Sequence, residues 1–234
     1  MFGSFQKSLV ISIEKLILKN KKINYFNIID VGSNIGDKSL SITKNLLKKK
    51  LNNFKVFSIE PTDYAFKKQK LNISLNPILE KKIDLFKYFV SSTKNKPKNI
   101  YSSWRLDKNK SSHKVHKGIL KIVDRNTKNI SLDDFILQNK IKDQIIIKID
   151  VDGFEMDVLK SLIKTLRNRK PVIFMEYAPY SFEEHGSSTK EFFNFIKEYQ
   201  YEIYDLNFNK LNKIKINDGA SVDIILNHKK SNLI

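Results

Sequence analysis

One aspartate and two glycines lie close together in the sequence Asp-Val-Gly-Ser-Asn-Ile-Gly at residues 30–36. This segment follows an apolar run and precedes a run with helical periodicity. Gly32 and Gly36 allow a ligand to approach the backbone, and a helix that begins here presents unpaired N–H groups. The pattern favours a site for a polar or charged cofactor, and an ordinary turn between a strand and a helix is the alternative.

The acidic residue before the first glycine narrows the chemistry of this turn. The spacing is not the G-x-G-x-x-G of nicotinamide and flavin sites, and a carboxylate at Asp30 would repel a pyrophosphate. It suits a ligand with positive charge, and S-adenosylmethionine carries an ammonium and a sulfonium. Ser33 and Asn34 lie inside the turn and join Asp30 and the two glycines as predicted cofactor-binding residues.

A second acidic position follows the next apolar run. Glu60 and Pro61 end that run, and Glu60 lies 24 residues after Gly36. A carboxylate there can accept hydrogen bonds from both ribose hydroxyls of an adenosine. NAD sites share this feature, so it indicates a nucleoside cofactor without choosing among them, and a capping turn is the alternative. Ser91 follows a third apolar run and is predicted at the same edge.

The densest acidic cluster is Lys-Ile-Asp-Val-Asp-Gly-Phe-Glu at residues 148–155. Asp152, Glu155 and Asp157 follow on the turn and helix, and because acids at the start of a helix often cap it, capping accounts for some of the three. Asp150 precedes the turn, ends a strand expected beside the first one, and therefore faces the reacting end of the cofactor. Glu176 ends the following strand, so the two carboxylates are expected to converge.

Two converging carboxylates can orient or deprotonate a hydroxyl group, and we assign that catalytic role to Asp150 and Glu176. Tyr177, Tyr180 and His185 are further candidates, of which His185 is kept as a third catalytic residue, although an exposed loop position is its plainer interpretation. Carboxylates also suit Mg²⁺, but we do not favour a metal and predict no metal ligands. The pair His113 and His116, and Trp104 beside Arg105, have chance or structural explanations of equal or greater weight.

The elements that must position these residues alternate between strand and helix patterns. Such alternation predicts an α/β fold with a mostly parallel seven-stranded sheet, helices on both faces and an antiparallel C-terminal hairpin. The expected strands cover residues 25–31, 54–59, 83–90, 144–149, 171–175, 201–206 and 220–226. The expected helices cover residues 5–19, 37–50, 62–73, 153–167 and 189–199, and one more begins at residue 131.

The chain organisation follows from these patterns. We expect residues 1–24 to form an N-terminal helix packed on the body, with a membrane-surface helix as the lesser alternative, and residues 25–234 to form a single domain. Residues 91–130 are a basic insertion, with 11 basic and 2 acidic residues. Short strand-like pieces occur within it at 99–105 and 118–123, and its length suggests a functional segment over the acceptor pocket.

Composition sets outer limits on function. The chain has 234 residues, a net charge of +18 and no cysteine, which excludes disulfide scaffolds, thiolate metal sites and cysteine nucleophiles. The charge suggests nucleic acid or an anionic surface. However, 39 of the 43 basic residues are lysine, and specific readers of nucleic acid favour arginine. No apolar run is long enough to span a membrane, no signal peptide is evident, and we expect a cytoplasmic protein.

The motifs together resemble one known family. Residues 30–36, Ile-Glu-Pro at 59–61, Ser-Leu-Asp-Asp-Phe at 131–135, residues 147–155 and Val-Ile-Phe-Met-Glu at 172–176 follow the order and spacing of FkbM-family methyltransferases. The resemblance covers about residues 28–180. It implies the Rossmann-like class I fold, S-adenosylmethionine as cofactor and O-methylation of sugars or other hydroxylated acceptors.

The same resemblance implies roles for individual residues. Gly32, Asn34, Gly36 and Glu60 would hold the cofactor, with Asp150 close to its methionine end or to the acceptor. Ser33 stands where the family usually has alanine, and Asp152 where it usually has glutamate. Neither departure affects the resemblance.

The predicted acceptor is a hydroxyl on a sugar, glycan, glycolipid or similar small molecule, and the basic insertion favours one that carries phosphate. The first alternative is a nucleic-acid methyltransferase that uses the basic surface, which the Asp-Val-Asp-Gly step after residue 149 disfavours. The second is an inactive nucleoside-binding scaffold. Weak association with a membrane surface is compatible with the charge, and nothing in the sequence specifies an oligomeric state.

Overall fold

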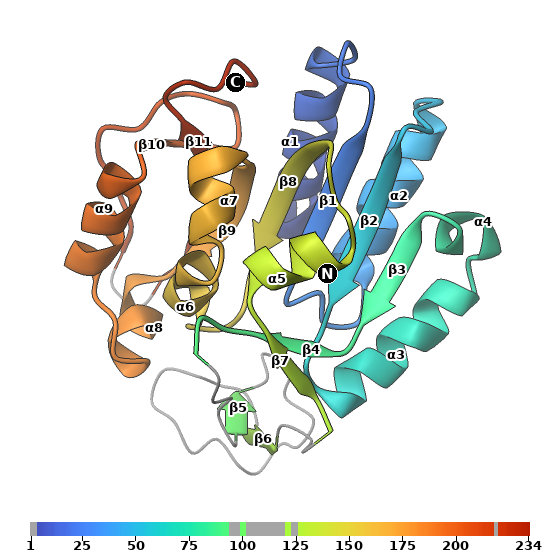
Figure 1. The fold of residues 1–234 in the computed structure, drawn as a ribbon, viewed down its shortest axis with the longest axis horizontal. Coiled ribbons are helices and arrows are strands. Elements are labelled where there is room, and N and C mark those ends of the chain that lie inside the picture. The colour runs from blue at the N-terminus through green and yellow to red at the C-terminus, as the bar shows by residue number, and fades with distance from the viewer. Residues whose placement is uncertain (1–3, 94–98, 102–119, 123–125, 218–219) are drawn as a thin grey trace.

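The computed structural model describes residues 4–93, 99–101, 120–122, 126–217 and 220–234. Its centre is a seven-stranded sheet in the order β10-β11-β9-β8-β1-β2-β3, which confirms the predicted class of fold (Figure 1). The strands are β1 Phe26–Val31, β2 Phe54–Ile59, β3 Ile83–Phe86, β8 Gln144–Ile149, β9 Val172–Tyr177, β10 Tyr201–Tyr204 and β11 Val222–His228. The pairs within β9-β8-β1-β2-β3 are parallel, and β11 is antiparallel to both β9 and β10.

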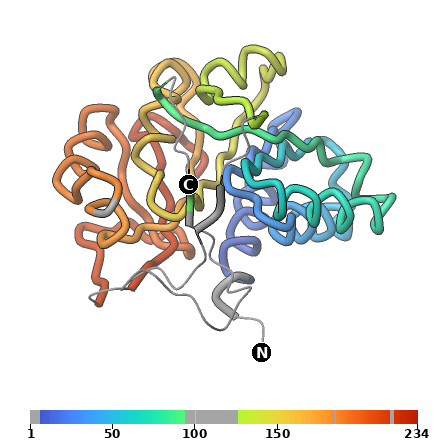
Figure 2. Tube along the Cα trace, turned by 90° about the horizontal axis from the view of Figure 1, so that it is seen from below, coloured from blue at the N-terminus to red at the C-terminus, as the bar shows by residue number. Residues whose placement is uncertain are grey.

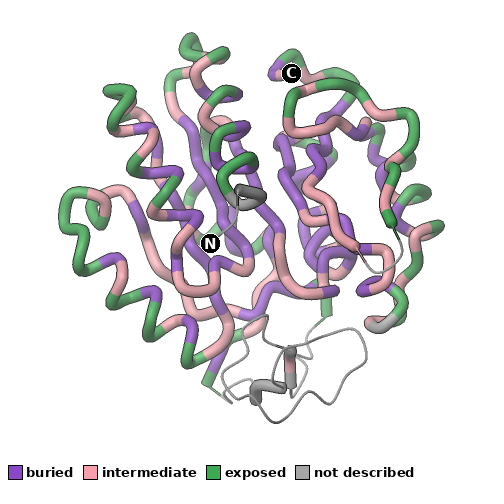
Figure 3. Tube along the Cα trace, turned by 180° about the vertical axis from the view of Figure 1, so that it is seen from behind, coloured by how far each residue is buried: buried purple, intermediate pink, exposed green. Residues whose placement is uncertain are grey.

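Apolar side chains on both faces of the central strands explain why helices cover both sides. Along β1, Ile28 belongs to one buried cluster and Ile29 to the other. In Figure 3 the strands are buried along most of their length, and exposed residues lie on the outer helix faces and in the turns. The longer helices are α1 Ser4–Lys19, α2 Asp37–Lys48, α3 Asp63–Ser74, α5 Leu132–Gln138 and α9 Thr189–Glu198.

The N-terminal helix α1 packs on the body. Leu9, Ile13, Leu16 and Ile17 are buried in the same cluster as residues of α2 and β1. The apolar face of α1 is therefore occupied by protein, which argues against the membrane-surface helix. Within the described ranges, no helix combines the length and apolar character needed to cross a membrane.

Two expected elements are divided in the structure. Residues 83–90 form β3 and then β4 Tyr88–Val90, which leaves the main sheet and pairs with β7 Lys128–Ile130. The segment crosses the carboxyl ends of the central strands from one half of the molecule to the other (Figures 1 and 2). Residues 153–167 form α6 Glu155–Lys160 and α7 Ile163–Asn168, because the Ser161 hydroxyl donates to the Val158 carbonyl and interrupts the helix.

Two short helices have no counterpart among the expected elements. They are α4 Pro77–Glu80 and α8 Pro179–Glu184, and both have proline in the first turn, where the missing N–H group has no helical acceptor. In the insertion, β5 Asn99–Tyr101 pairs with β6 Leu120–Ile122, as the strand-like pieces suggested. Residues 94–98, 102–119 and 123–125 of the basic insertion, which include its two histidines, Trp104 and Arg105, lie outside the described residues.

Candidate active site

The glycine loop after β1 is fixed by its own backbone. Gly32 and Gly36 have positive φ angles of 74° and 83°, which glycine adopts without strain. A Cβ atom on Gly32 would lie 1.9 Å from the carbonyl oxygen of Asp150, so glycine is required for the loop to pack against the end of β8. The N–H groups of Gly32 and Ser33 both donate to the Ile59 carbonyl at 3.0 Å. The loop is thus held between β8 and β2.

The helix that follows begins without a side-chain cap. Gly36 is the N-cap residue of α2, which is twelve residues long. The first N–H groups of an uncapped helix are available to a ligand, and its dipole favours a negative group such as a carboxylate.

Asp30 lies beneath the loop rather than in it. Its side chain is 0% exposed, accepts a hydrogen bond from Ser39 Oγ at 2.6 Å and forms an ion pair with Lys148 Nζ at 3.0 Å. Asp30 and Lys148 are directly opposed across the parallel pair β1–β8. The structure therefore buries the Asp30 carboxylate between Ser39 and Lys148.

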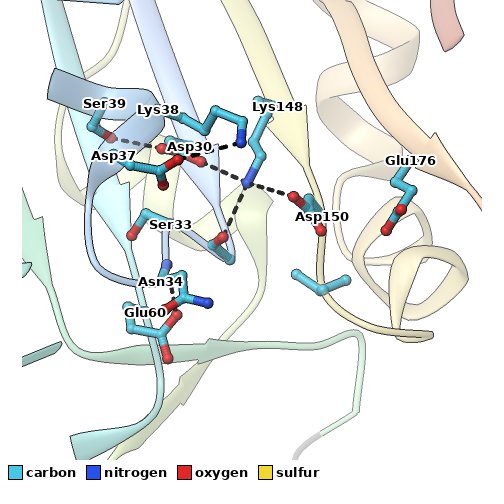
Figure 4. Close-up of polar contacts among 12 residues, drawn as sticks. Asp30, Ser33, Asn34, Asp37, Lys38, Ser39, Glu60, Lys148, Asp150 and Glu176 are labelled. Atoms are coloured by element: carbon cyan, nitrogen blue, oxygen red, sulfur yellow. Dashed lines mark hydrogen bonds and ion pairs between the residues drawn. The ribbon is translucent and has the colours of Figure 1, made fainter. Parts of the chain in front are cut away.

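Lys148 connects three parts of the site (Figure 4). Besides Asp30, its ammonium donates to the Gly32 carbonyl at 3.0 Å and lies 3.4 Å from the Asp150 carboxylate. Burial lowers the pKa of Lys148, but Asp30 and Asp150 outweigh this effect and raise the pKa above its ordinary value. Lys148 stays charged and ties the glycine loop to Asp150. Lys148 belongs to the acidic cluster at residues 148–155, but no role was predicted for it from the sequence.

Glu60 is almost fully buried at the end of β2 and is hydrogen-bonded on both oxygens. Asn34 N–H donates to Oε2 at 3.0 Å, and the Thr62 N–H and hydroxyl donate to Oε1. A carboxylate has about four acceptor positions, so a further hydroxyl can bind. Burial raises the pKa of Glu60, and the hydrogen bonds from Thr62 and Asn34 oppose that effect. The carboxylate and the glycine loop therefore share one hydrogen-bonded unit.

Three other predicted cofactor residues occupy different positions. The Ser33 hydroxyl faces α3 and accepts from Gln69 Nε2 at 2.6 Å, so it supports the loop from within. The Pro61 carbonyl accepts from the Thr127 hydroxyl at 3.0 Å. Ser91 is buried, and its N–H donates to the Ile130 carbonyl at 3.0 Å. These contacts fix the walls of the site.

Three carboxylates lie on three neighbouring strands at this edge of the sheet. Asp150 directly follows β8, Glu176 lies in β9 and Asp223 lies in β11. The Asp150 side chain is 40% exposed, and in Figure 4 its carboxylate is directed toward Lys148, with Glu176 on its other side. Asp223 on β11 is directly opposed to Glu176 on β9, and sequence reasoning missed it. The Ser221 hydroxyl donates to Glu176 Oε1 at 2.5 Å.

The three carboxylates influence one another. Burial, followed by repulsion from Asp150, raises the pKa of Glu176 to about 7, while the hydrogen bond from Ser221 lowers it. The same two causes raise the pKa of Asp223 to about 6, and Lys38 and Lys148 oppose them. A carboxyl group with a pKa near neutrality can accept a proton from a reacting hydroxyl.

Glu155 organises the turn between β8 and α6. Its carboxylate is 1% exposed and accepts from the N–H groups of Val151 and Gly153 at 3.2 and 3.1 Å. Burial raises the pKa of Glu155 to about 8 despite these hydrogen bonds. This residue caps the turn, and it holds the backbone that carries Asp150.

His185 lies closer to this turn than its loop position suggested. It is the C-cap residue of α8, and its ring centroid lies 4.2 Å from that of Phe154. A Cβ atom on Gly153 would lie 2.1 Å from His185 Cδ2, so the two segments are in direct contact. Tyr177 is buried among Phe182 and other aromatic side chains, a core position rather than a reactive one.

Metal-binding geometry does not occur in the part of the chain that the structure describes. No group of three or more histidine, aspartate or glutamate side chains there is arranged to hold an ion.

Comparisons with known proteins identify the family of the chain. A sequence profile described as the methyltransferase FkbM domain matches residues 30–203. A methyltransferase FkbM from Methylobacillus flagellatus KT has a similar structure, with 16% identity and a TM-score of 0.52. The alignment covers 87% of this chain and 44% of that protein, so this chain spans less than half of its length.

A second solved structure has a similar fold at much lower identity. It is the magnesium protoporphyrin IX methyltransferase of Synechocystis PCC 6803 with bound S-adenosylmethionine, at 6% identity and a TM-score of 0.50. The alignment covers 96% of this chain and 79% of that one. No curated protein sequence matches the chain.

The predicted family resemblance and the class I α/β fold are both confirmed. The profile match includes the glycine loop, Glu60, Asp150 and Glu176. Because that match spans most of the chain, the protein belongs to the family of FkbM methyltransferase domains.

Proposed function

We propose that this chain is an S-adenosylmethionine-dependent methyltransferase that methylates a hydroxyl group on a sugar, glycan, glycolipid or similar small acceptor. The observation that carries the proposal is the pair Asp150 and Glu176. Both end neighbouring parallel strands beside the glycine loop, and the pKa of Glu176 is raised to about 7. A proton acceptor of this kind is what an alcohol nucleophile requires.

Family membership supports S-adenosylmethionine as the cofactor. The uncapped start of α2 fits its carboxylate, and Asp150 is a nearby acceptor for its ammonium. The remaining acceptor position on Glu60 fits a ribose hydroxyl. When bound, S-adenosylmethionine supplies an electrophilic methyl group on a sulfonium.

The chain's own residues prepare the nucleophile. Lys148 holds Asp150 in place, and Asp150 orients the acceptor hydroxyl by accepting its hydrogen bond. Glu176 takes the hydroxyl proton at its carboxylate, which leaves the acceptor oxygen able to act as the nucleophile. Ser221 fixes the orientation of Glu176 through Oε1. His185 borders the same turn, and we assign it to the wall of the acceptor pocket.

The surroundings of these carboxylates limit where an acceptor can carry charge. Asp150, Glu176 and Asp223 would repel a phosphate close to the reacting hydroxyl. An acceptor with phosphate must therefore direct it away from β9, toward the basic insertion. We propose that five lysines of the insertion bind this phosphate, all of them outside the described residues. They are Lys94, Lys96, Lys98, Lys108 and Lys110.

The same charge distribution disfavours the nucleic-acid alternative. The carboxylates of Asp150, Glu176 and Asp223 would repel a phosphate backbone that came close to them. The alternative of an inactive scaffold predicts that the cofactor binds and that no methyl group is transferred. A binding assay combined with a transfer assay therefore distinguishes it from the proposed function.

Titration calorimetry with S-adenosylmethionine, with NAD as the control ligand, tests the cofactor. We expect binding of the first and not of the second, and the reverse result would refute the proposal. Transfer of a labelled methyl group to panels of glycans, glycolipids and RNA then tests the acceptor class. Label in RNA alone would favour the first alternative, and binding without label in any panel would favour the inactive scaffold.

A further inference from the structure

Basic residues gather at the edge of the sheet opposite to the site. The turns before β1, β2, β8 and β9, the segment after β11 and the last residues of helices α1 and α2 contain twelve basic residues and one acidic residue, Asp143. We call these twelve residues the basic edge. They are Lys19, Lys21, Lys22, Lys48, Lys49, Lys50, Lys140, Lys142, Arg169, Lys170, Lys229 and Lys230.

The basic edge is continuous across the sheet. Its turns belong to five consecutive strands in the order β11-β9-β8-β1-β2, and neighbouring strands lie about 4.8 Å apart, so the edge is about 19 Å wide. The turns before β1 and β2 and the C-terminal segment form the upper rim in Figure 1. Ten of the lysines are exposed. Within the described chain, one of the twelve residues has an ion pair, Lys49 with Glu14 at 4.0 Å.

A polar hollow of about 400 Å³ lies within the basic edge. Arg169, Lys170 and Lys230 line it together with Asn20, Ser231 and Asn232, and no acidic residue does. The carbonyls of Ile141 and Asp143 hold the Arg169 guanidinium at 3.2 and 2.7 Å.

Next to the hollow, burial lowers the pKa of His228, and Lys170 and Lys230 lower it further. The positive charges that line the hollow therefore contribute to the lowered pKa of His228.

We propose that the basic edge binds an anionic phospholipid surface, with one headgroup phosphate in the hollow and others over the flanking lysines. Juxtamembrane lysines attract anionic lipids as point charges, without needing a fixed geometry. An extended row of exposed lysines across five strands matches a continuous anionic layer better than a single small anion.

Nucleic acid fits the same edge less well. Arg169 is its one arginine, and the guanidinium already donates to three carbonyls, including that of Lys142. Proteins that bind single strands also use exposed aromatic side chains for stacking. The exposed aromatic residues of the described chain, Tyr64 and Phe193, lie outside the basic edge.

Co-sedimentation of the full chain with vesicles tests this proposal. We expect binding to vesicles that contain phosphatidylglycerol, none to phosphatidylcholine alone, and weakening by added salt. The variant K21Q/K22Q/K49Q/K50Q should reduce binding about tenfold or more. The matched control K67Q/K68Q/K70Q/K190Q removes the same charge from exposed positions on α3 and α9 and should bind as the unmodified chain does.

Three results would overturn the proposal. They are binding to phosphatidylcholine alone, equal losses in the two variants, and binding to single-stranded RNA without binding to vesicles. Calorimetry with S-adenosylmethionine is run on the same samples. Cofactor binding at the opposite edge should be unchanged, so the outcome does not depend on the proposed methyl transfer.

Discussion

The two edges of the sheet carry opposite charges and hold them in different ways. At the carboxyl edge, Asp30, Lys148 and Glu155 are buried, and each is fixed by ion pairs or hydrogen bonds. At the basic edge, the lysines are exposed, and one of them has an ion pair. Buried charges must be paired, so they define geometry, whereas exposed charges define a potential. The carboxyl edge is thus built for positioning and the basic edge for attraction.

Helix dipoles account for part of this contrast. α1 and α2 end at the basic edge with Lys19 and Lys48 in their last turns, and α2 begins at the carboxyl edge with Asp37. Such placements are each worth about 0.3–1 kcal/mol, and the effect fades within one turn. Lys21 and Lys22 lie beyond the end of α1, so the dipole does not explain them.

The largest difference between the edges should appear in stability. Lys148→Met leaves Asp30 buried without its counter-ion, so we expect the free energy of unfolding to fall by about 3–5 kcal/mol. Urea denaturation at neutral pH measures this change. In contrast, K21Q/K22Q should alter stability by no more than about 0.5 kcal/mol per residue. Equal effects of the two variants would show that burial does not distinguish the edges.

The parts of the site carried by local sequence could be predicted. The glycine loop, Glu60 and Asp150 each follow a buried apolar strand, and the ends of parallel strands meet at one edge. Gly32 was predicted to let a ligand approach the backbone. In the structure, the absence of a Cβ atom at Gly32 makes room for the carbonyl of Asp150, which is distant in sequence.

The parts carried by pairing between distant strands could not be predicted. Asp223 reaches the site because β11 inserts between β9 and β10 and aligns it with Glu176. The division of residues 83–90 depends on β4 finding β7 as a partner. In the sequence, nothing distinguishes Lys148 from the many other lysines. Its role becomes evident from the pairing of β1 with β8, which places it directly opposite Asp30.

The carboxyl edge should make stability depend on pH. The pKa of Glu155 is raised from 4.5 to about 8 in the folded chain, so the folded state holds a proton that the unfolded state releases. Its contribution is therefore complete below pH 4.5 and is lost as the pH rises toward 8, by up to about 1.4 kcal/mol per pH unit. Glu155→Gln should flatten that slope in urea titrations between pH 5 and 8. An unchanged slope, or an equal change in the exposed control Glu183→Gln, would contradict this.

Substitutions at the carboxyl edge should also affect catalysis, with a smaller change in free energy than the changes in stability described above. If Glu176 accepts the hydroxyl proton, kcat/KM should rise with pH through about 7 as its carboxyl group ionises. Glu176→Gln should lower kcat by about 10²-fold or more and remove that rise. Steady-state rates across the pH range measure both effects. A variant that keeps the rise would transfer the role of base to another group.

The finest test uses two neighbours that act on Glu176 in opposite directions. The hydrogen bond from Ser221 lowers the pKa of Glu176, whereas the charge of Asp223 raises it. Ser221→Ala should therefore move the midpoint of the pH–rate profile upward and Asp223→Asn should move it downward, each by less than about one unit. K21Q/K22Q should leave the midpoint unchanged at physiological salt, because the Debye length is about 8 Å and these lysines lie at the far ends of the strands. Shifts of the same sign in both neighbours would mean that the titrating group is not Glu176, and a shift in the lysine variant would mean that the two edges are electrostatically coupled.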